Sequence, residues 1–76
     1  MSASIYYKPV LDNGVYINIG LASDFATKMD LPRNFSDVDI QFLRGVATGN
    51  EGFKNGCDEI IDAIEKHGTI TVFAEY

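Results

Sequence analysis

Apolar and polar residues alternate at both ends of this chain and recur at helical spacing between them. Two alternating stretches, residues 4–11 and 15–21, lie on either side of Asp12-Asn13-Gly14. Glycine supplies the positive φ that tight hairpin turns need. The first third of the chain therefore predicts a β-hairpin.

The register of this hairpin follows from which side chains share a face. A two-residue loop, Asn13-Gly14, would mix polar and apolar side chains on one face, whereas a three-residue loop over 12–14 keeps one face apolar. We therefore expect the three-residue loop. It gives four pairs: Leu11 with Val15, Pro9 with Ile17, Tyr7 with Ile19, and Ile5 with Leu21.

Two helices are predicted after the hairpin. The first covers residues 24–30 with Ser23 as its N-cap, and Pro32 stops it because the residue before a proline is disfavoured in helical conformation; a loop through Asn34 follows. The second begins at Ser36, which forms a capping-box pair with Asp39. Its apolar arc covers about half of the circumference, which predicts a helix that is covered on two sides. The residues of this arc are Val38, Ile40, Phe42, Leu43, Val46 and Ala47.

A third helix and a final strand are predicted at the C-terminal end. Apolar residues lie on one helical stripe between residues 53 and 64, and acidic residues fill much of the remaining surface. His67 and Gly68 end this helix, because glycine adopts the left-handed conformation that satisfies the last carbonyl groups. Residues 69–76 are β-branched and aromatic, which is typical of a strand. Alternation sends two sets of side chains to opposite faces: Ile70, Val72 and Ala74 toward the core, and Thr71, Phe73 and Glu75 outward.

These elements predict an α+β fold in the order ββαααβ. We expect a three-stranded, mainly antiparallel sheet, made of the N-terminal hairpin and the C-terminal strand, with three helices packed on one face. The chain has 76 residues, which is the size of one small globular domain over residues 1–76. If the helices cover one face, Tyr6, Tyr16 and Phe73 form an aromatic patch on the other.

The charge is concentrated toward the C-terminus. Residues 1–50 carry five acids and four bases, whereas residues 51–76 carry six acids and two bases, and the net charge is −5. An acidic surface repels phosphate backbones, so we expect no direct nucleic-acid contact and favour a basic protein partner. The absence of a signal peptide pattern and of an apolar run of about 20 residues predicts a cytoplasmic protein without a membrane contact.

Nucleophilic catalysis is not expected from the single cysteine and the single histidine. Cys57 and His67 lie ten residues apart on the third helix, which places them about 15 Å apart along its axis and about 80° apart around it. Cys57 is therefore interpreted as a core residue and His67 as a C-terminal helix residue. The glycines 49, 52 and 56 match no phosphate-binding pattern, so no catalytic, metal or cofactor site is predicted.

Two surfaces remain as candidate contact sites. Asp58, Asp62 and Glu65 follow i, i+4, i+7 spacing, so their carboxylates line one helix face, which is either a solvated surface or a contact for a basic partner. The aromatic patch of Tyr6, Tyr16 and Phe73 either consists of ordinary strand residues or binds a second copy or a partner protein.

The favoured hypothesis is a non-catalytic protein-protein interaction module, namely a small inhibitor, adaptor or regulatory protein. A narrower version is an acidic mimic of nucleic acid that blocks a basic partner. The alternative is a homo-oligomeric domain that binds a small ligand or catalyses a reaction, with its site shared between subunits. A pocket with converging polar groups distinguishes the alternative from the first hypothesis.

Overall fold

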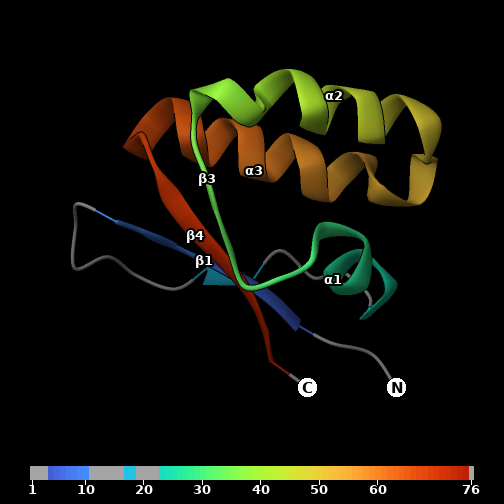
Figure 1. Ribbon diagram of the computed structural model, residues 1–76, viewed down its shortest axis with the longest axis horizontal. Coiled ribbons are helices and arrows are strands. Elements are labelled where there is room, and N and C mark those ends of the chain that lie inside the picture. Colours follow the sequence, from blue (N-terminus) through green and yellow to red (C-terminus); the bar gives the residue numbers. More distant parts are fainter. Residues whose placement is uncertain (1–3, 11–16, 19–22, 76) are drawn as a thin grey trace.

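A sheet and a set of helices form two sides of the molecule (Figure 1). The computed structural model describes residues 4–10, 17–18 and 23–75. It confirms the α+β fold class and the predicted order of two strands, three helices and a final strand, and one short further strand lies between the first two helices. The elements are β1 (Ser4–Pro9), β2 (Ile17–Asn18), α1 (Ser23–Met29), β3 (Arg33–Phe35), the 3-10 helix η1 (Asp37–Asp39), α2 (Ile40–Gly49), the 3-10 helix η2 (Glu51–Phe53), α3 (Lys54–His67) and β4 (Ile70–Glu75).

The sheet has one strand more than predicted. Its order is β2-β1-β4-β3, and each neighbouring pair is antiparallel. The extra strand is β3, where Arg33 lies opposite Val72 and Phe35 lies opposite Ile70. The expectation of a loop through Asn34 was therefore wrong, because pairing with β4 makes this short segment extended.

The hairpin register also differs from the prediction. Tyr7 lies opposite Ile17, whereas the predicted partner of Tyr7 was Ile19. A shift of two residues does not exchange the two faces of a strand, so the pattern of apolar faces alone cannot detect it. Residues 11–16, which include the predicted loop, lie outside the described residues.

The first two helices form close to where local signals place them. α1 covers Ser23–Met29, one residue earlier at each end than the predicted helix over residues 24–30, and Asp30, with a φ of 56°, follows its last residue. The capping box is present, because the Ser36 N–H donates to Asp39 Oδ2 at 2.9 Å. The first turn after Ser36 is the 3-10 helix η1, which leads directly into α2.

α2 and α3 form an antiparallel pair (Figure 1). α3 ends at Gly68 as predicted, since this glycine has a φ of 78° and its N–H donates to the Ile64 carbonyl at 2.8 Å. Figure 1 shows α3 nearer than α2 to the strands.

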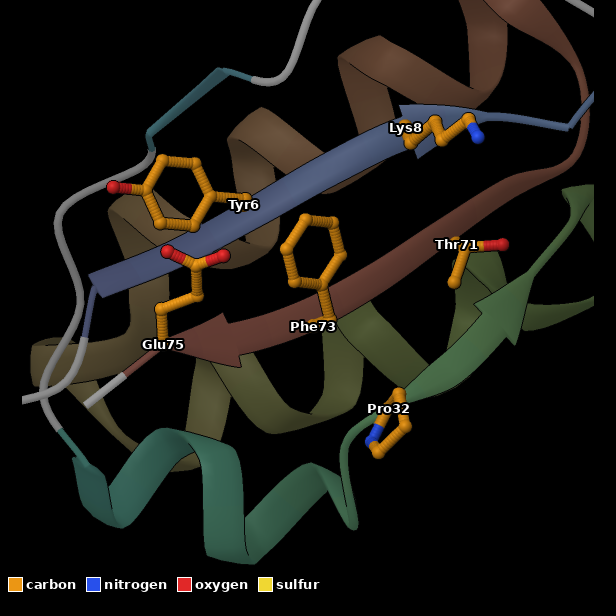
Figure 2. A pocket seen from close by; sticks show the side chains of 6 residues that line it. All are labelled: Tyr6, Lys8, Pro32, Thr71, Phe73 and Glu75. Carbon is orange, nitrogen blue, oxygen red and sulfur yellow. The ribbon is translucent and has the colours of Figure 1, made fainter.

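The strand β4 divides its side chains between the two faces of the sheet as predicted. Ile70 and Val72 are fully buried, and Ala74 packs against the core. Thr71, Phe73 and Glu75 lie on the opposite face, which the helices leave open (Figure 2). One face of the sheet is therefore core and the other is surface.

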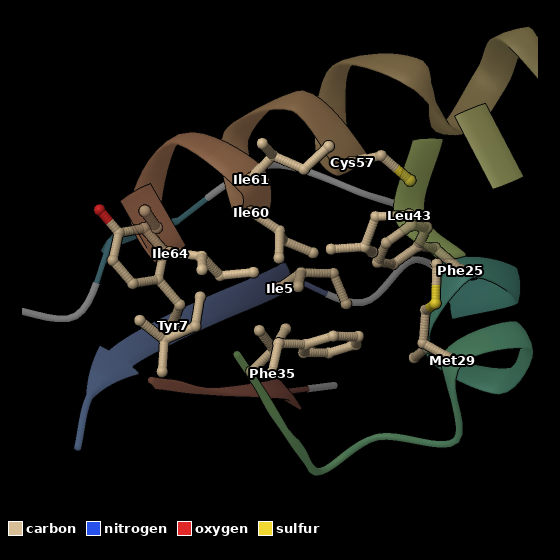
Figure 3. Close-up of a cluster of buried hydrophobic side chains, with 14 residues drawn as sticks. Ile5, Tyr7, Phe25, Met29, Phe35, Leu43, Cys57, Ile60, Ile61 and Ile64 are labelled. Atoms are coloured by element: carbon tan, nitrogen blue, oxygen red, sulfur yellow. The ribbon is translucent and has the colours of Figure 1, made fainter. Parts of the chain in front are cut away.

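The core lies between the sheet and the helices (Figure 3). It takes residues from all three helices and from β1, β3 and β4. Its buried members are Ile5, Tyr7, Phe25, Ala26, Met29, Phe35, Leu43, Cys57, Ile60, Ile61, Ala63, Ile64, Ile70 and Val72.

The described residues cover α2 on one side, and not on two sides as predicted. Leu43 is the buried residue of this helix. Phe42 is 45% exposed, and Val38, in the preceding 3-10 helix, is 83% exposed. The expectation was wrong for a single chain, because hydrophobic periodicity does not specify which molecule covers an apolar face.

Candidate functional site

The open face of the sheet holds a shallow depression of about 660 Å³ (Figure 2). Alternating residues of β1 and β4 form its floor, and Pro32 lies at its border. We call this surface the open sheet face, and its residues are Tyr6, Lys8, Thr71, Phe73 and Glu75.

Two aromatic rings occupy the middle of the open sheet face. Tyr6 lies directly opposite Phe73 in the β1–β4 register. Their ring centroids are 5.7 Å apart, and the ring planes meet at 21°, which is a stacked arrangement. The structure thus brings together two of the three residues predicted for the aromatic patch, whereas Tyr16 lies outside the described residues. Their role in binding stays a prediction.

Opposite charges mark the two ends of the open sheet face. Lys8 is level with Thr71 at one end, and Glu75 is level with Ser4 at the other. Thr71 Oγ1 donates to Asn34 Oδ1 at 2.7 Å, which connects β4 with the edge strand β3. The face is therefore apolar in its centre and polar at its ends.

A second hollow surface runs along α2, with a volume of about 500 Å³. Its walls are aromatic and aliphatic side chains, and its floor includes glycines of the helix itself. We call it the α2 groove, and it is lined by Lys28, Phe42, Gly45, Val46, Gly49, Asn50 and Phe53.

Ring contacts and an ion pair hold the walls of the α2 groove. The Arg33 guanidinium lies 4.5 Å from the ring centroid of Phe35 and 5.2 Å from that of Phe42. Arg33 Nη2 also donates to Asp39 Oδ1 at 2.9 Å, so the capping residue of the helix fixes this guanidinium. Phe53, which also lines the groove, packs against the buried Phe25 in a T-shaped arrangement, with 5.2 Å between the ring centroids and 81° between the ring planes.

Two residues that line the α2 groove, Gly45 and Gly49, have no side chain. A Cβ atom added to Gly45 or to Gly49 would meet no atom of the described residues within 4 Å. Packing among the residues that the structure describes therefore does not require glycine at either position. Glycine in a helix interior is less favourable than alanine by about 1 kcal/mol, so Gly45 lowers the stability of α2. No close packing among the described residues explains this glycine.

The predicted acidic stripe faces solvent. Asp58, Asp62 and Glu65 are all exposed on α3. Lys54 Nζ approaches Asp58 Oδ2 at 4.0 Å, a long contact between two exposed groups that contributes little to stability. The interpretation of this stripe as a contact for a basic partner stays a prediction.

The cysteine and the histidine lie in different surroundings. Cys57 is fully buried, and this burial, together with the charge of Asp58, raises the pKa of its thiol to about 11. The thiol is therefore protonated at neutral pH, when it is a weak nucleophile. The His67 ring lies 6.2 Å from that of Tyr7, whose pKa is raised by burial and by the charge of Glu59. Within the described residues, no group of three or more His, Cys, Asp and Glu side chains could hold a metal ion.

Comparison with protein-family models, with curated proteins and with solved structures finds no match to this chain. None of the helices in the described part of the chain combines the length and the apolar character that crossing a bilayer requires. The functional interpretation therefore rests on the two surfaces themselves.

Sequence reasoning missed the α2 groove, although the sequence contains its signal. Phe42, Val46 and Gly49 follow i, i+4, i+7 spacing, which places them on one side of a helix. The apolar arc was interpreted as two covered sides of the helix. Gly45, which shares one side of the helix with Phe42 and Val46, was the feature that could have revealed the groove.

Proposed function

We propose that this protein is a non-catalytic protein-interaction module that binds an amphipathic helix of a partner protein in the α2 groove. The observation that carries the proposal is the 45% exposure of Phe42 in the groove along α2, a helix whose opposite side packs into the core. A regulatory, inhibitory or adaptor role is the class of activity that such a module performs.

Phe42 belongs to a continuous apolar surface, because it lines the α2 groove together with the partly buried Val46 and Phe53. Isolated apolar side chains are common on protein surfaces, but contiguous ones that line a groove are characteristic of binding sites. Phe42, Val46 and Phe53 line the same groove. Complete burial of a fully exposed large apolar side chain contributes roughly 1.5–3 kcal/mol, and Phe42, which is 45% exposed, can gain about half of this on binding. Phe42 is the most exposed apolar side chain of the groove, so we expect it to be the main contributor to binding.

A helix is the occupant that fits this groove. Gly45 and Gly49 are spaced i, i+4 and have no side chains, so a second helix can approach the backbone of α2 closely along the line between Phe42 and Phe53. Helices bind such grooves through apolar residues at i, i+3, i+4 and i+7. Lys28 is the charged residue that lines the groove, so we expect an acidic residue beside the apolar stripe of the partner.

The proposal is tested by photo-crosslinking in the cells that naturally make the protein. A photoreactive phenylalanine analogue replaces Phe42, and in a control variant it replaces Asp62, which is exposed on α3. We expect one discrete adduct from position 42 that position 62 does not give, with the crosslink in an amphipathic helical segment that contains an acidic residue. The same adducts from both positions, or no adduct from position 42, would contradict the proposal.

A further inference from the structure

We propose that the open sheet face is a homodimer interface, in which two copies of the chain pack face to face about a two-fold axis at the Tyr6–Phe73 pair. This inference goes beyond the α2 groove and uses a different surface. It rests on an arrangement of charges that is complementary to itself.

The charges of the open sheet face are symmetric about its aromatic centre. In the β1–β4 register, Lys8 is level with Thr71, Tyr6 with Phe73, and Ser4 with Glu75. The aromatic pair is therefore midway between the level of Lys8 and the level of Glu75. Four residues of a strand separate the two charged levels, which is about 13 Å.

A two-fold axis exchanges the two ends of this face. The axis lies between the two sheets and crosses the strands at the level of Tyr6 and Phe73. Rotation about it brings Lys8 of each copy over the end that carries Glu75 of the other copy. Packed sheets are about 10 Å apart and neighbouring strands about 4.8 Å apart, distances that a lysine and a glutamate side chain span together. The interface thus contains two equivalent ion pairs around four aromatic rings, as an isologous contact requires.

The distribution of charge favours a second copy as the occupant. The residues of the open sheet face include one base and one acid, so the face is locally neutral within a chain of net charge −5. The acidic side chains of Asp58, Asp62 and Glu65 belong to α3, on the helical side of the molecule. Two copies that meet through their sheets therefore bring matching charges together at the contact while their acidic helices point away from it.

The size of the face predicts a weak dimer. β1 and β4 have six residues each, whereas β3 has three and β2 has two, so the sheet covers a flat area of at most about 19 Å by about 20 Å. Two such footprints together are smaller than about 1,000 Å², which is below the standard size of specific interfaces and corresponds to weak, transient complexes. The dimer is therefore expected to form in a concentration-dependent manner and to dissociate on dilution.

Charge exchange tests the proposed pairing directly. Sedimentation equilibrium at low salt measures the dimer dissociation constant of the wild type, Lys8→Glu, Glu75→Lys and the double variant, from about 10 µM to about 1 mM, because contacts of this size are transient. Each single reversal replaces both attractive pairs by repulsive ones and should weaken the dimer about tenfold or more. The double variant restores both pairs with their signs exchanged, and its dissociation constant should return to within about twofold of the wild type.

Two control variants separate the pairing from the net charge. Each reversal changes the net charge of −5 by two units, to −7 for Lys8→Glu and to −3 for Glu75→Lys. Lys66→Glu and Glu65→Lys make the same changes at exposed positions of α3 and should leave the dimer nearly unchanged. If general repulsion governed association, Glu75→Lys would strengthen the dimer, whereas the pairing predicts that it weakens the dimer.

Three results would overturn the proposal. They are a wild-type chain that stays monomeric over the whole concentration range, single reversals that leave the dimer unchanged, and a double variant that is weaker than either single variant. Circular dichroism of each variant establishes that the fold is retained. Phe42→Ser should not affect this dimer. If the Phe42→Ser variant no longer dimerises, the contact lies on α2 instead.

Discussion

The Tyr6 ring stacks on the ring of Phe73, its direct partner across β1 and β4, with 5.7 Å between the centroids. The pair lies on the face of the sheet that the helices do not cover (Figure 2). Two strands that are distant in sequence thus share one aromatic contact on the surface. This contact is the centre of the proposed dimer interface.

The first prediction concerns the energy of this aromatic pair within one chain. A double-mutant cycle with Tyr6→Ala and Phe73→Ala should give a coupling free energy of about 0.5–1.5 kcal/mol, because stacked rings contribute this much beyond the area that they bury. Urea unfolding at low micromolar concentration measures it on the monomer. The control cycle combines Tyr6→Ala with Phe42→Ala on α2, which should show no coupling. Equal coupling in both cycles would mean that the stacking adds nothing specific.

The second prediction concerns the bare floor of the α2 groove. Gly45→Ala should raise the free energy of unfolding by about 1 kcal/mol, because alanine favours the helix and its Cβ meets no atom within 4 Å. For a domain of this size, that change raises the midpoint of thermal unfolding by about 4–8 °C. The same substitution should weaken binding of the partner helix, because the added methyl group projects into the groove. A lower midpoint of thermal unfolding would show that the folded chain itself requires glycine at position 45.

Gly68→Ala provides the matched control for this substitution. A Cβ atom at Gly68 also meets no atom of the described residues within 4 Å. However, the backbone of Gly68 has a φ of 78°, which residues other than glycine rarely adopt. Alanine should therefore destabilise the protein by about 1–3 kcal/mol at this position. The two glycines should thus give shifts of opposite sign in the same thermal unfolding experiment.

Local chemical signals made much of the fold predictable. The capping pair of Ser36 and Asp39 and the stop at Gly68 each depend on residues within one or two turns of helix, so the sequence alone determines them. The alternation of β4 correctly separated Val72 from Phe73, because a strand with one buried face needs a period of two.

Features that depend on distant contacts were not predictable in the same way. β3 has three residues, and its Asn34 side chain meets Thr71, which is 37 residues away in sequence. The pattern of apolar residues shows which side of α2 is apolar. It does not show whether the same chain or another molecule packs against that side. For this reason the sequence indicated an apolar side of α2 but not a groove for a partner.

The third prediction concerns the alkaline stability of the fold. Burial raises the pKa of the Cys57 thiol from 9.0 to about 11, and the charge of Asp58 adds to this shift. Between these values the unfolded chain loses a proton that the folded chain keeps, so the free energy of unfolding falls as the pH rises, by up to about 1.4 kcal/mol per pH unit. Well below pH 9.0 the thiol is protonated in both the folded and the unfolded chain, so the free energy of unfolding no longer changes with pH through this group. Urea unfolding at about pH 8 and about pH 10 measures the difference.

Cys57→Ala is the control for the pH dependence. Its side chain cannot ionise, so the fall in stability between the two pH values should be smaller than in the wild type. The raised pKa of Tyr7 acts in the same direction and remains in both proteins. The same pH dependence in the two proteins would mean that the Cys57 thiol is not responsible.

The central claim is that the α2 groove binds a helix of a partner, and the affinity of the crosslinked segment tests it most directly. That segment, made as a synthetic peptide, is titrated into the wild type, Phe42→Ser and the control Gln41→Ser, which changes an exposed neighbour on α2. We expect Phe42→Ser to weaken binding about 30-fold, as the loss of a central apolar contact does, and Gln41→Ser to stay within about twofold of the wild type. Both variants should keep the circular dichroism spectrum of the wild type, because Phe42 is 45% exposed. Equal affinity of Phe42→Ser and the wild type would contradict the claim.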